Sequence, residues 1–274
     1  MKRILIATDL SSASDCAVEY GFRLASALDA TVILVAAYEE VPIPVTDTMS
    51  MTVVDAPGVR ALVEQGLQRQ QALFQQDRLQ PIETMAVHGP VVRSILDTVE
   101  ELGADLIVVG MKGKGKRLRK LFGSTVTALA RKTPVPLLVI PEEASYVPPA
   151  NILLGNDIRP DTDIHVLDPM MELVATFASR VYALRVVKKG AKEFIEVIHP
   201  RNPLLEMNKI WEVKYEYRLG DDVVTALNEF VRQHNIQLAV MVPHAHSIPE
   251  RWFLRGHTRE MIFEATVPLL ILPE

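Results

Sequence analysis

The chain repeats itself, and this repetition constrains its fold more than any other feature of the sequence. Two pairs of segments match at a separation of 132 residues without a gap: Leu106–Val109 with Leu238–Met241, and Val135–Glu142 with Val267–Glu274. A third pair, Ile4–Asp9 with Ile152–Asp157, matches at a separation of 148 residues. The first copy therefore contains about sixteen extra residues, which we place between Val41 and Gly58.

A short proline segment separates the two copies. Tyr146–Pro149 ends in two adjacent prolines, which cannot donate to a sheet and which resist helix formation. We therefore predict two domains, residues 1–145 and residues 150–274. With 49% hydrophobic residues among 274, the chain has enough apolar material for two cores.

Strand and helix patterns alternate along each copy. In the first copy the strands are expected at Ile4–Thr8, Thr31–Tyr38, Ile82–Val87, Leu106–Val109 and Val135–Ile140. Helices are expected at Ser14–Leu28, Val59–Leu79, Val91–Leu102 and Ser124–Lys132, and the second copy repeats this order. Apolar strands separated by amphipathic helices predict an α/β fold, with a mostly parallel five-stranded sheet of flavodoxin-like or Rossmann-like type in each domain. In such folds ligands bind at the carboxyl ends of the strands.

Charge and composition narrow the classes of partner. The formal net charge of −5 disfavours non-specific binding to nucleic acid. No segment approaches the ~20 uninterrupted apolar residues of a membrane span. A single cysteine, Cys16, rules out an internal disulfide and fits a reducing compartment, so we expect a cytoplasmic protein.

One glycine motif follows the fourth strand of the first copy. Gly110 and Gly113 stand at the strand end, and nine residues later Gly123 precedes Ser124 and Thr125 at the start of a helix. Glycines allow a ligand to approach the backbone, and the free N–H groups of a helix start suit a phosphate. The segment between the glycines is strongly basic, with Lys112, Lys114, Lys116, Arg117, Arg119 and Lys120. The pattern favours a polyphosphate site. The alternative is a purely structural role, with a glycine turn before a capped helix and a solvated basic loop.

With this spacing, Gly-x2-Gly-x9-Gly-Ser, the sequence resembles the universal stress protein family. The segment Thr8–Ser14 after the first strand, the pair Gly89-Pro90 and the terminal Val-Pro-x-Leu strand of both copies also resemble that family. The resemblance covers essentially the whole chain and implies tandem domains of the adenine nucleotide alpha hydrolase-like type. It also implies ATP or ADP in the first copy, held by residues that match the family's site: Thr8, Asp9, Gly110, Lys112, Gly113, Gly123, Ser124 and Thr125. Asp9 is the candidate ligand for Mg²⁺, and its alternative role is to cap the following helix.

The second copy departs from the motif. Val242, Ala245 and Arg255 stand where the first copy has its three glycines, although Asp157 still matches Asp9. Side chains at the glycine positions would crowd a phosphate, so we expect a degenerate copy with a structural or regulatory role, and a changed ligand there stays open.

The resemblance implies a nucleotide-dependent stress-response module that acts on an unknown protein partner. It also implies antiparallel pairing of the last strands of the two copies, as an intramolecular pseudo-dimer, and association of two chains. An exposed apolar edge strand needs such a partner. The sequence shows no pair of a nucleophile and a general base that could act together. A slow Mg²⁺-dependent ATPase is therefore only the second hypothesis, and a nucleotide-independent interaction module is the third.

Overall fold

The computed structural model describes most of both repeats. The described residues are 1–39, 42–44, 51–53, 56–75, 81–111, 124–155, 163–187, 211–220, 222–243 and 267–273. The predicted site residues Lys112, Gly113 and Gly123, and also Asp157, Ala245 and Arg255, lie outside them. Of Ser124 the structure describes the backbone.

A single ten-stranded sheet runs through the described parts of both repeats. The first repeat contributes β1 (Arg3–Ala7), β2 (Thr31–Tyr38), β5 (Ile82–His88), β6 (Leu106–Met111) and β7 (Leu137–Pro141). The second contributes β8 (Asn151–Gly155), β9 (Arg180–Val187), β10 (Val213–Leu219), β11 (Leu238–Met241) and β12 (Leu269–Ile271). The order across the sheet is β10-β9-β8-β11-β12-β7-β6-β1-β2-β5, so each repeat numbers its own strands 3-2-1-4-5. This is the Rossmann-like order, and it decides between the two fold types that the sequence left open.

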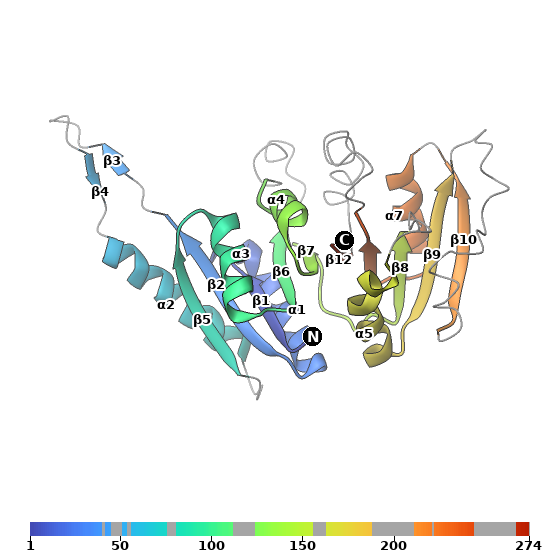
Figure 1. Cartoon of the computed structure of the whole chain (residues 1–274), viewed down its shortest axis with the longest axis horizontal. Helices are drawn as coiled ribbons and strands as arrows, with labels where there is room; N and C mark the ends of the chain where they lie inside the picture. Colours follow the sequence, from blue (N-terminus) through green and yellow to red (C-terminus); the bar gives the residue numbers. More distant parts are fainter. Residues whose placement is uncertain are drawn as a thin grey trace.

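The two repeats join through their last strands (Figure 1). β12 pairs antiparallel with β7, with Leu270 opposite Leu138, whereas the strands within each repeat are parallel. This is the pairing that the resemblance to the universal stress protein family implied. Each repeat thereby covers the edge that the other would expose.

Helices cover both faces of the sheet. They are α1 (Ser12–Leu28), α2 (Ala56–Gln75), α3 (Val91–Leu102), α4 (Ser124–Lys132), α5 (Asp168–Phe177) and α7 (Val223–Gln233), with a 3₁₀ turn η1 (Ile164–Leu167) before α5. Strand residues alternate between the faces, so that Ile4 and Ile6 join the core under α1 and α2, while Leu5 joins the core under α3 and α4. The first of these cores continues into the second repeat beneath α5.

The elements expected for the first repeat are confirmed, with shifted ends, whereas the second and fourth helices expected for the second repeat fall outside the described residues. α2 begins at Ala56 rather than Val59, β7 begins at Leu137 rather than Val135, and β6 continues through Gly110 to Met111. The extra residues of the first repeat fall between β2 and β5, as predicted. There β3 (Pro42–Pro44) and β4 (Met51–Val53) form an antiparallel hairpin that extends away from the body (Figure 1). The domain limits at residues 145 and 150 stay a prediction, since the segment between β7 and β8 is non-helical chain within one continuous sheet.

None of the helices in the described part of the chain combines the length and the apolar character that a bilayer crossing requires.

Candidate functional site

A cavity of about 330 Å³ opens at the carboxyl ends of β1, β2 and β6. β1 pairs with β2 on one side and with β6 on the other. α1 follows β1 onto one face of the sheet, while α4 follows β6 onto the other. The crevice between them is the switch point of the strand order, where Rossmann-like proteins bind ligands. Its lining is Ala7, Thr8, Asp9, Ala13, Ser14, Val35, Ala37, Val91, Ile95, Val109, Gly110, Thr125 and Val126.

The structure brings four predicted site residues together in this lining: Thr8, Asp9, Gly110 and Thr125. Ser124 is the first residue of α4, so the helix begins where the motif predicted and presents its N-terminal turn to the cavity. Free N–H groups and a positive dipole end are thereby available at the cavity wall. The side chain of Asp9 is the one titratable group among the described lining residues.

Gly110 is required for the packing of α1 on the sheet. A Cβ atom placed there would lie 3.2 Å from Cβ of Ala17 and 3.6 Å from Cα of Ser14. The distance to Ala17 is tighter than most real contacts, whereas the distance to Ser14 is ordinary, so the glycine lets Ala17 of α1 lie close to the end of β6. The residue thus has a packing role in addition to the open cavity surface that it provides.

Thr8 organises the turn between β1 and α1. Its buried hydroxyl accepts a hydrogen bond from the Leu10 amide at 3.0 Å and donates one to Oε1 of Gln70 at 2.9 Å. Oγ of Ser14 lies 2.8 Å away. These protein partners occupy the hydroxyl group, so its main contribution is to hold the cavity wall in shape.

Asp9 combines an exposed position with a structural role. Its Oδ1 accepts hydrogen bonds from the backbone N–H of Ser11 at 3.0 Å and from the Ser11 hydroxyl at 2.5 Å. This is the turn before α1, in which Leu10 takes a positive φ of 60°. The N-cap residue of α1 is Ser11, and no side chain caps the helix, so the capping role that the sequence left as an alternative for Asp9 is not observed. Asp9 instead closes the turn before the helix, and it lines the cavity.

The apolar walls were missed by the sequence reasoning. Val35 and Ala37 come from β2, and Val91 and Ile95 come from α3. The predicted pair Gly89-Pro90 does open α3: Pro90 is its N-cap residue, and Gly89 has a φ of +129°. Small residues at successive strand ends, Ala7 and Ala37, were the signal that could have located this space.

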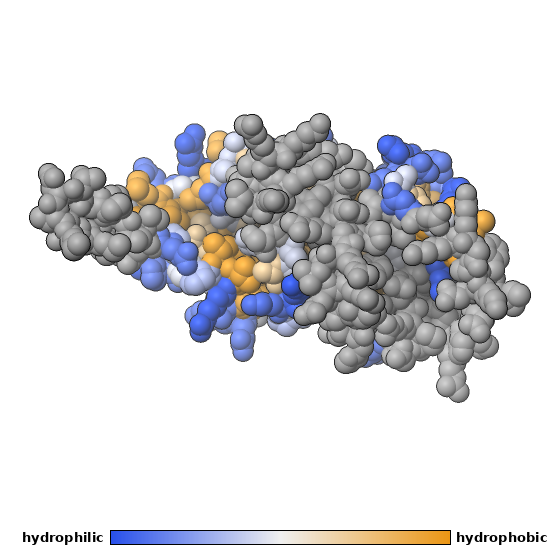
Figure 2. Space-filling model, turned by 90° about the horizontal axis from the view of Figure 1, so that it is seen from above, coloured by the Kyte–Doolittle hydropathy of each residue, from blue (hydrophilic) through white to orange (hydrophobic). Residues whose placement is uncertain are grey.

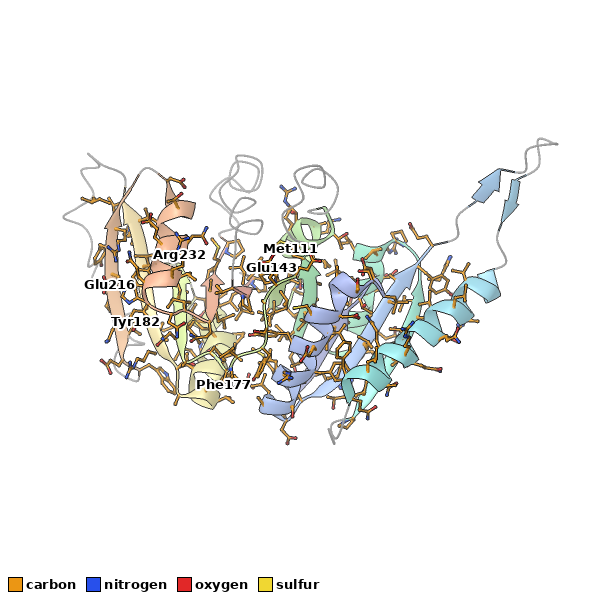
Figure 3. The ribbon with its side chains drawn as sticks, turned by 180° about the vertical axis from the view of Figure 1, so that it is seen from behind. Met111, Glu143, Phe177, Tyr182, Glu216 and Arg232 are labelled. Carbon is orange, nitrogen blue, oxygen red and sulfur yellow. The ribbon has the colours of Figure 1, made fainter. Side chains whose placement is uncertain are left out.

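β6 ends beside the cavity, where Val109 and Gly110 line it, and the end of β7 pairs with the end of β6. The Glu142 N–H donates to the carbonyl oxygen of Met111 at 3.1 Å, and Figure 3 shows Met111 and Glu143 close together there. From above, Figure 2 shows apolar surface of the first repeat among hydrophilic side chains. Val91, at the cavity, is 41% exposed.

Cys16 lies on the side of α1 that faces the segment after β7. Its thiol donates to the carbonyl oxygen of Ala144 at 2.6 Å, and burial, followed by the charge of Glu19, raises the pKa of the thiol. A raised pKa keeps the thiol protonated and lowers its reactivity. Among the described residues, no cluster of three or more histidine, cysteine or acidic side chains could hold a metal ion.

A doubly wound sheet with a cavity at its switch point defines an α/β protein of the Rossmann-like class, and the cavity is its candidate ligand site. The family model described as the universal stress protein family matches residues 1–141, which is more than half of the chain. The chain belongs to the universal stress protein family.

Curated relatives agree with this assignment. A universal stress protein of Mycobacterium tuberculosis (strain H37Rv) is 43% identical over 54 residues, which are 20% of this chain and 18% of that protein. One from Mycolicibacterium smegmatis is 28% identical over 167 residues, 59% of this chain and 56% of that protein. The matches therefore span little more than half the length of these relatives at most.

Solved structures show the same fold over the whole chain. A universal stress protein from Archaeoglobus fulgidus matches with a TM-score of 0.70 at 16% identity, covering 99% of this chain and 96% of that one. A functionally unknown protein from Pseudomonas aeruginosa PAO1 matches with a TM-score of 0.65 at 11% identity, covering 100% and 92%.

Proposed function

We propose that the first repeat binds ATP or ADP and that the chain works as a nucleotide-dependent regulatory module of the stress response. The observation that carries this proposal is the cavity in which the β1 end, Gly110 of β6 and the first turn of α4 meet. The glycine motif of the sequence begins at this β6 end and finishes at this helix start.

The chemistry of the lining supports an adenine nucleotide. Its volume of about 330 Å³ is at the lower end of the range of small-molecule sites. Val35, Ala37 and Ile95 offer apolar surface for a base. The N-terminal turn of α4 offers the field and N–H groups that phosphates need.

The other predicted ligands complete the proposal from the sequence. Lys112, Gly113, Gly123 and Ser124 would contact the phosphates, and Asp9 would contact the ribose or a bound Mg²⁺. Because Asp9 is the one titratable group in the described lining, we place binding ahead of ATP hydrolysis. A cytoplasmic location, a protein partner that reads the bound state, and association with a second chain belong to the same proposal.

The test is to denature the purified protein and to identify any released nucleotide by chromatography and mass spectrometry, with its stoichiometry. We expect about one ATP or ADP per chain, as for one working repeat. A value near two would move the site assignment to both repeats. None, even after incubation with Mg-ATP, would overturn nucleotide binding and leave an interaction module.

A matched pair of variants locates the site. Gly113 and Ala245 occupy equivalent positions in the two repeats. Gly113→Glu places a carboxylate in the proposed phosphate site and should abolish binding of Mg-ATP, whereas Ala245→Glu should leave it within about twofold of wild type. Equal loss in both variants would contradict a site in the first repeat alone.

A further inference from the structure

We infer that Gln70, which lies outside the cavity on α2, is a positioning residue that holds the β1–α1 turn in the shape required for ligand binding. The inference rests on the proposed function of the first repeat for its ligand. The geometry of the turn can be tested without any ligand.

The side-chain amide of Gln70 bridges two elements. Its Nε2 donates to Oδ1 of Asp15 on α1 at 2.7 Å, and its Oε1 accepts from the hydroxyl of Thr8 at 2.9 Å. Gln70 is 5% exposed, so water cannot readily replace these partners. One end of the amide thus bonds to Thr8 in the cavity wall, and the other end bonds to α1.

The carboxylate of Asp15 gives this network a direction. An ionised carboxylate only accepts hydrogen bonds, so the NH₂ group of Gln70 must face Asp15 and the carbonyl oxygen must face Thr8. The Thr8 proton then points to Gln70, which leaves the lone pairs of Thr8 for the Leu10 amide at 3.0 Å. Gln70 therefore fixes the orientation of a hydroxyl in the cavity lining.

A second contact, one helical turn earlier on α2, holds the same turn. The side chain of Leu10 packs over Gly66, where a Cβ atom would lie 2.7 Å from Leu10 Cδ1. Residues four apart lie on one face of a helix, so Gly66 and Gln70 face the turn together. Leu10 has a positive φ of 60°, a conformation that is unfavourable for a residue other than glycine and needs support from its surroundings.

This arrangement links the ligand site to the segment that the second repeat lacks. Figure 1 shows α2 continuing from the β3–β4 hairpin along the first repeat. A displacement of α2 would release Thr8 and Leu10 at once, and with them Asp9 between them. The position of α2 and the occupancy of the cavity are therefore coupled.

The test combines hydrogen exchange of the Leu10 amide, read by NMR in the nucleotide-free protein, with calorimetric titration of Mg-ATP. Gln70→Met keeps the side-chain length but removes both hydrogen bonds. We expect at least about tenfold faster exchange at Leu10 and about tenfold weaker binding of Mg-ATP. The control is Gln68→Met, at an exposed position of the same helix, which should stay within about twofold of wild type for both.

A rescue variant separates positioning from a general loss of stability. Gln70→Glu faces Asp15 with a like charge and should behave as Gln70→Met does. Adding Asp15→Asn exchanges donor and acceptor, so that both hydrogen bonds can form again at the wild-type net charge. The double variant should recover both measurements to within about threefold of wild type.

The outcomes are distinct. The inference is overturned if both Gln70 variants match the Gln68→Met control in the exchange rate of Leu10 and in the affinity for Mg-ATP. It is also overturned if the double variant recovers neither measurement. If wild type binds no Mg-ATP, the proposed function fails, while the exchange rate of Leu10 still decides whether Gln70 holds the turn.

Discussion

The two repeats share one strand order and differ in how closely the first helix approaches the sheet. α1 lies against β1, β6 and β7, whereas among the described residues α5 makes no comparable backbone approach to any strand. α1 buries the small residues Ala17, Gly21 and Ala25 among larger ones, and Gly21 lies directly against Ile6 of β1, whereas the buried residues of α5 are Met170, Leu173 and Val174. Small residues on a helix allow a short helix–sheet distance and large ones prevent it.

The residue at the end of the fourth strand also differs in size between the two repeats. Gly110 leaves room for α1, and the second repeat has the buried residue Val242 at that place. The comparison teaches that a repeat can keep its sheet while the residue at this strand end changes from glycine to valine, because the strand order depends on backbone pairing, whereas the space beside a strand end depends on side-chain size.

The largest loss of stability is expected for substitutions at the junction between the two repeats. Leu138 and Leu270 pair across the β7–β12 junction, and both are almost fully buried. Leu138→Ala and Leu270→Ala should each lower the free energy of unfolding by about 3 kcal/mol, since each leaves a cavity in the shared core. Urea denaturation measures this, and a large loss for Leu138→Ala with none for Leu270→Ala would show that the junction does not couple the repeats.

The next largest loss of stability is expected when Gly110 of the first repeat is replaced by valine, the residue at the equivalent position of the second repeat. Gly110→Val adds branched carbon atoms where even a Cβ lies 3.2 Å from Ala17, so we expect a loss of about 2 kcal/mol in stability, together with loss of Mg-ATP binding. Gly155, at a strand end of the second repeat, is the control, because a Cβ there is 3.6 Å from its nearest neighbour. Gly155→Ala should change stability little, and equal losses in both variants would contradict this interpretation.

A smaller loss is expected at the turn before α1. Thr8→Val keeps the shape of the side chain and removes the hydroxyl, which leaves the buried carbonyl oxygen of Gln70 and the Leu10 amide without a partner. The free energy of unfolding should fall by about 1.5 kcal/mol, measured by thermal and urea denaturation. Thr8→Ser, which retains the hydroxyl, should lose less; an equal loss would assign the effect to packing.

The smallest expected effect is a loss of stability at alkaline pH, which arises from two titratable residues of α1, Tyr20 and Cys16, and has no counterpart in α5. Burial, followed by the nearby Tyr146, raises the pKa of Tyr20, and burial also raises the pKa of Cys16. A group whose pKa is raised by folding stabilises the protein below its unfolded pKa, and this contribution is lost as the pH rises. The urea midpoint should therefore fall as the pH rises above the ordinary values of 9.0 for Cys16 and 10.0 for Tyr20. Tyr20→Phe should flatten that decline, and an unchanged slope would contradict it.

The sequence by itself determined the repeat, the alternation of strands and helices, and the start of α4 at Ser124. These follow from local patterns, because apolar periodicity and helix-start residues act over a few positions. The antiparallel pairing of the last strands was expected from the family resemblance, and the repeated apolar segment indicated only that both edge strands need a partner. Sequence could not choose between two strand orders, because either order satisfies the same periodicity.

Only the tertiary structure decided the composition of the cavity wall. Val35, Val91 and Ile95 belong to ordinary apolar patterns, and nothing local separates a residue that lines a cavity from one that fills a core. Likewise, Gln70 is one of several glutamines on an amphipathic helix, and its partners Thr8 and Asp15 lie 62 and 55 residues away in the chain. Such contacts exist only after α1 and α2 have packed together on one face of the sheet, and no local pattern records them.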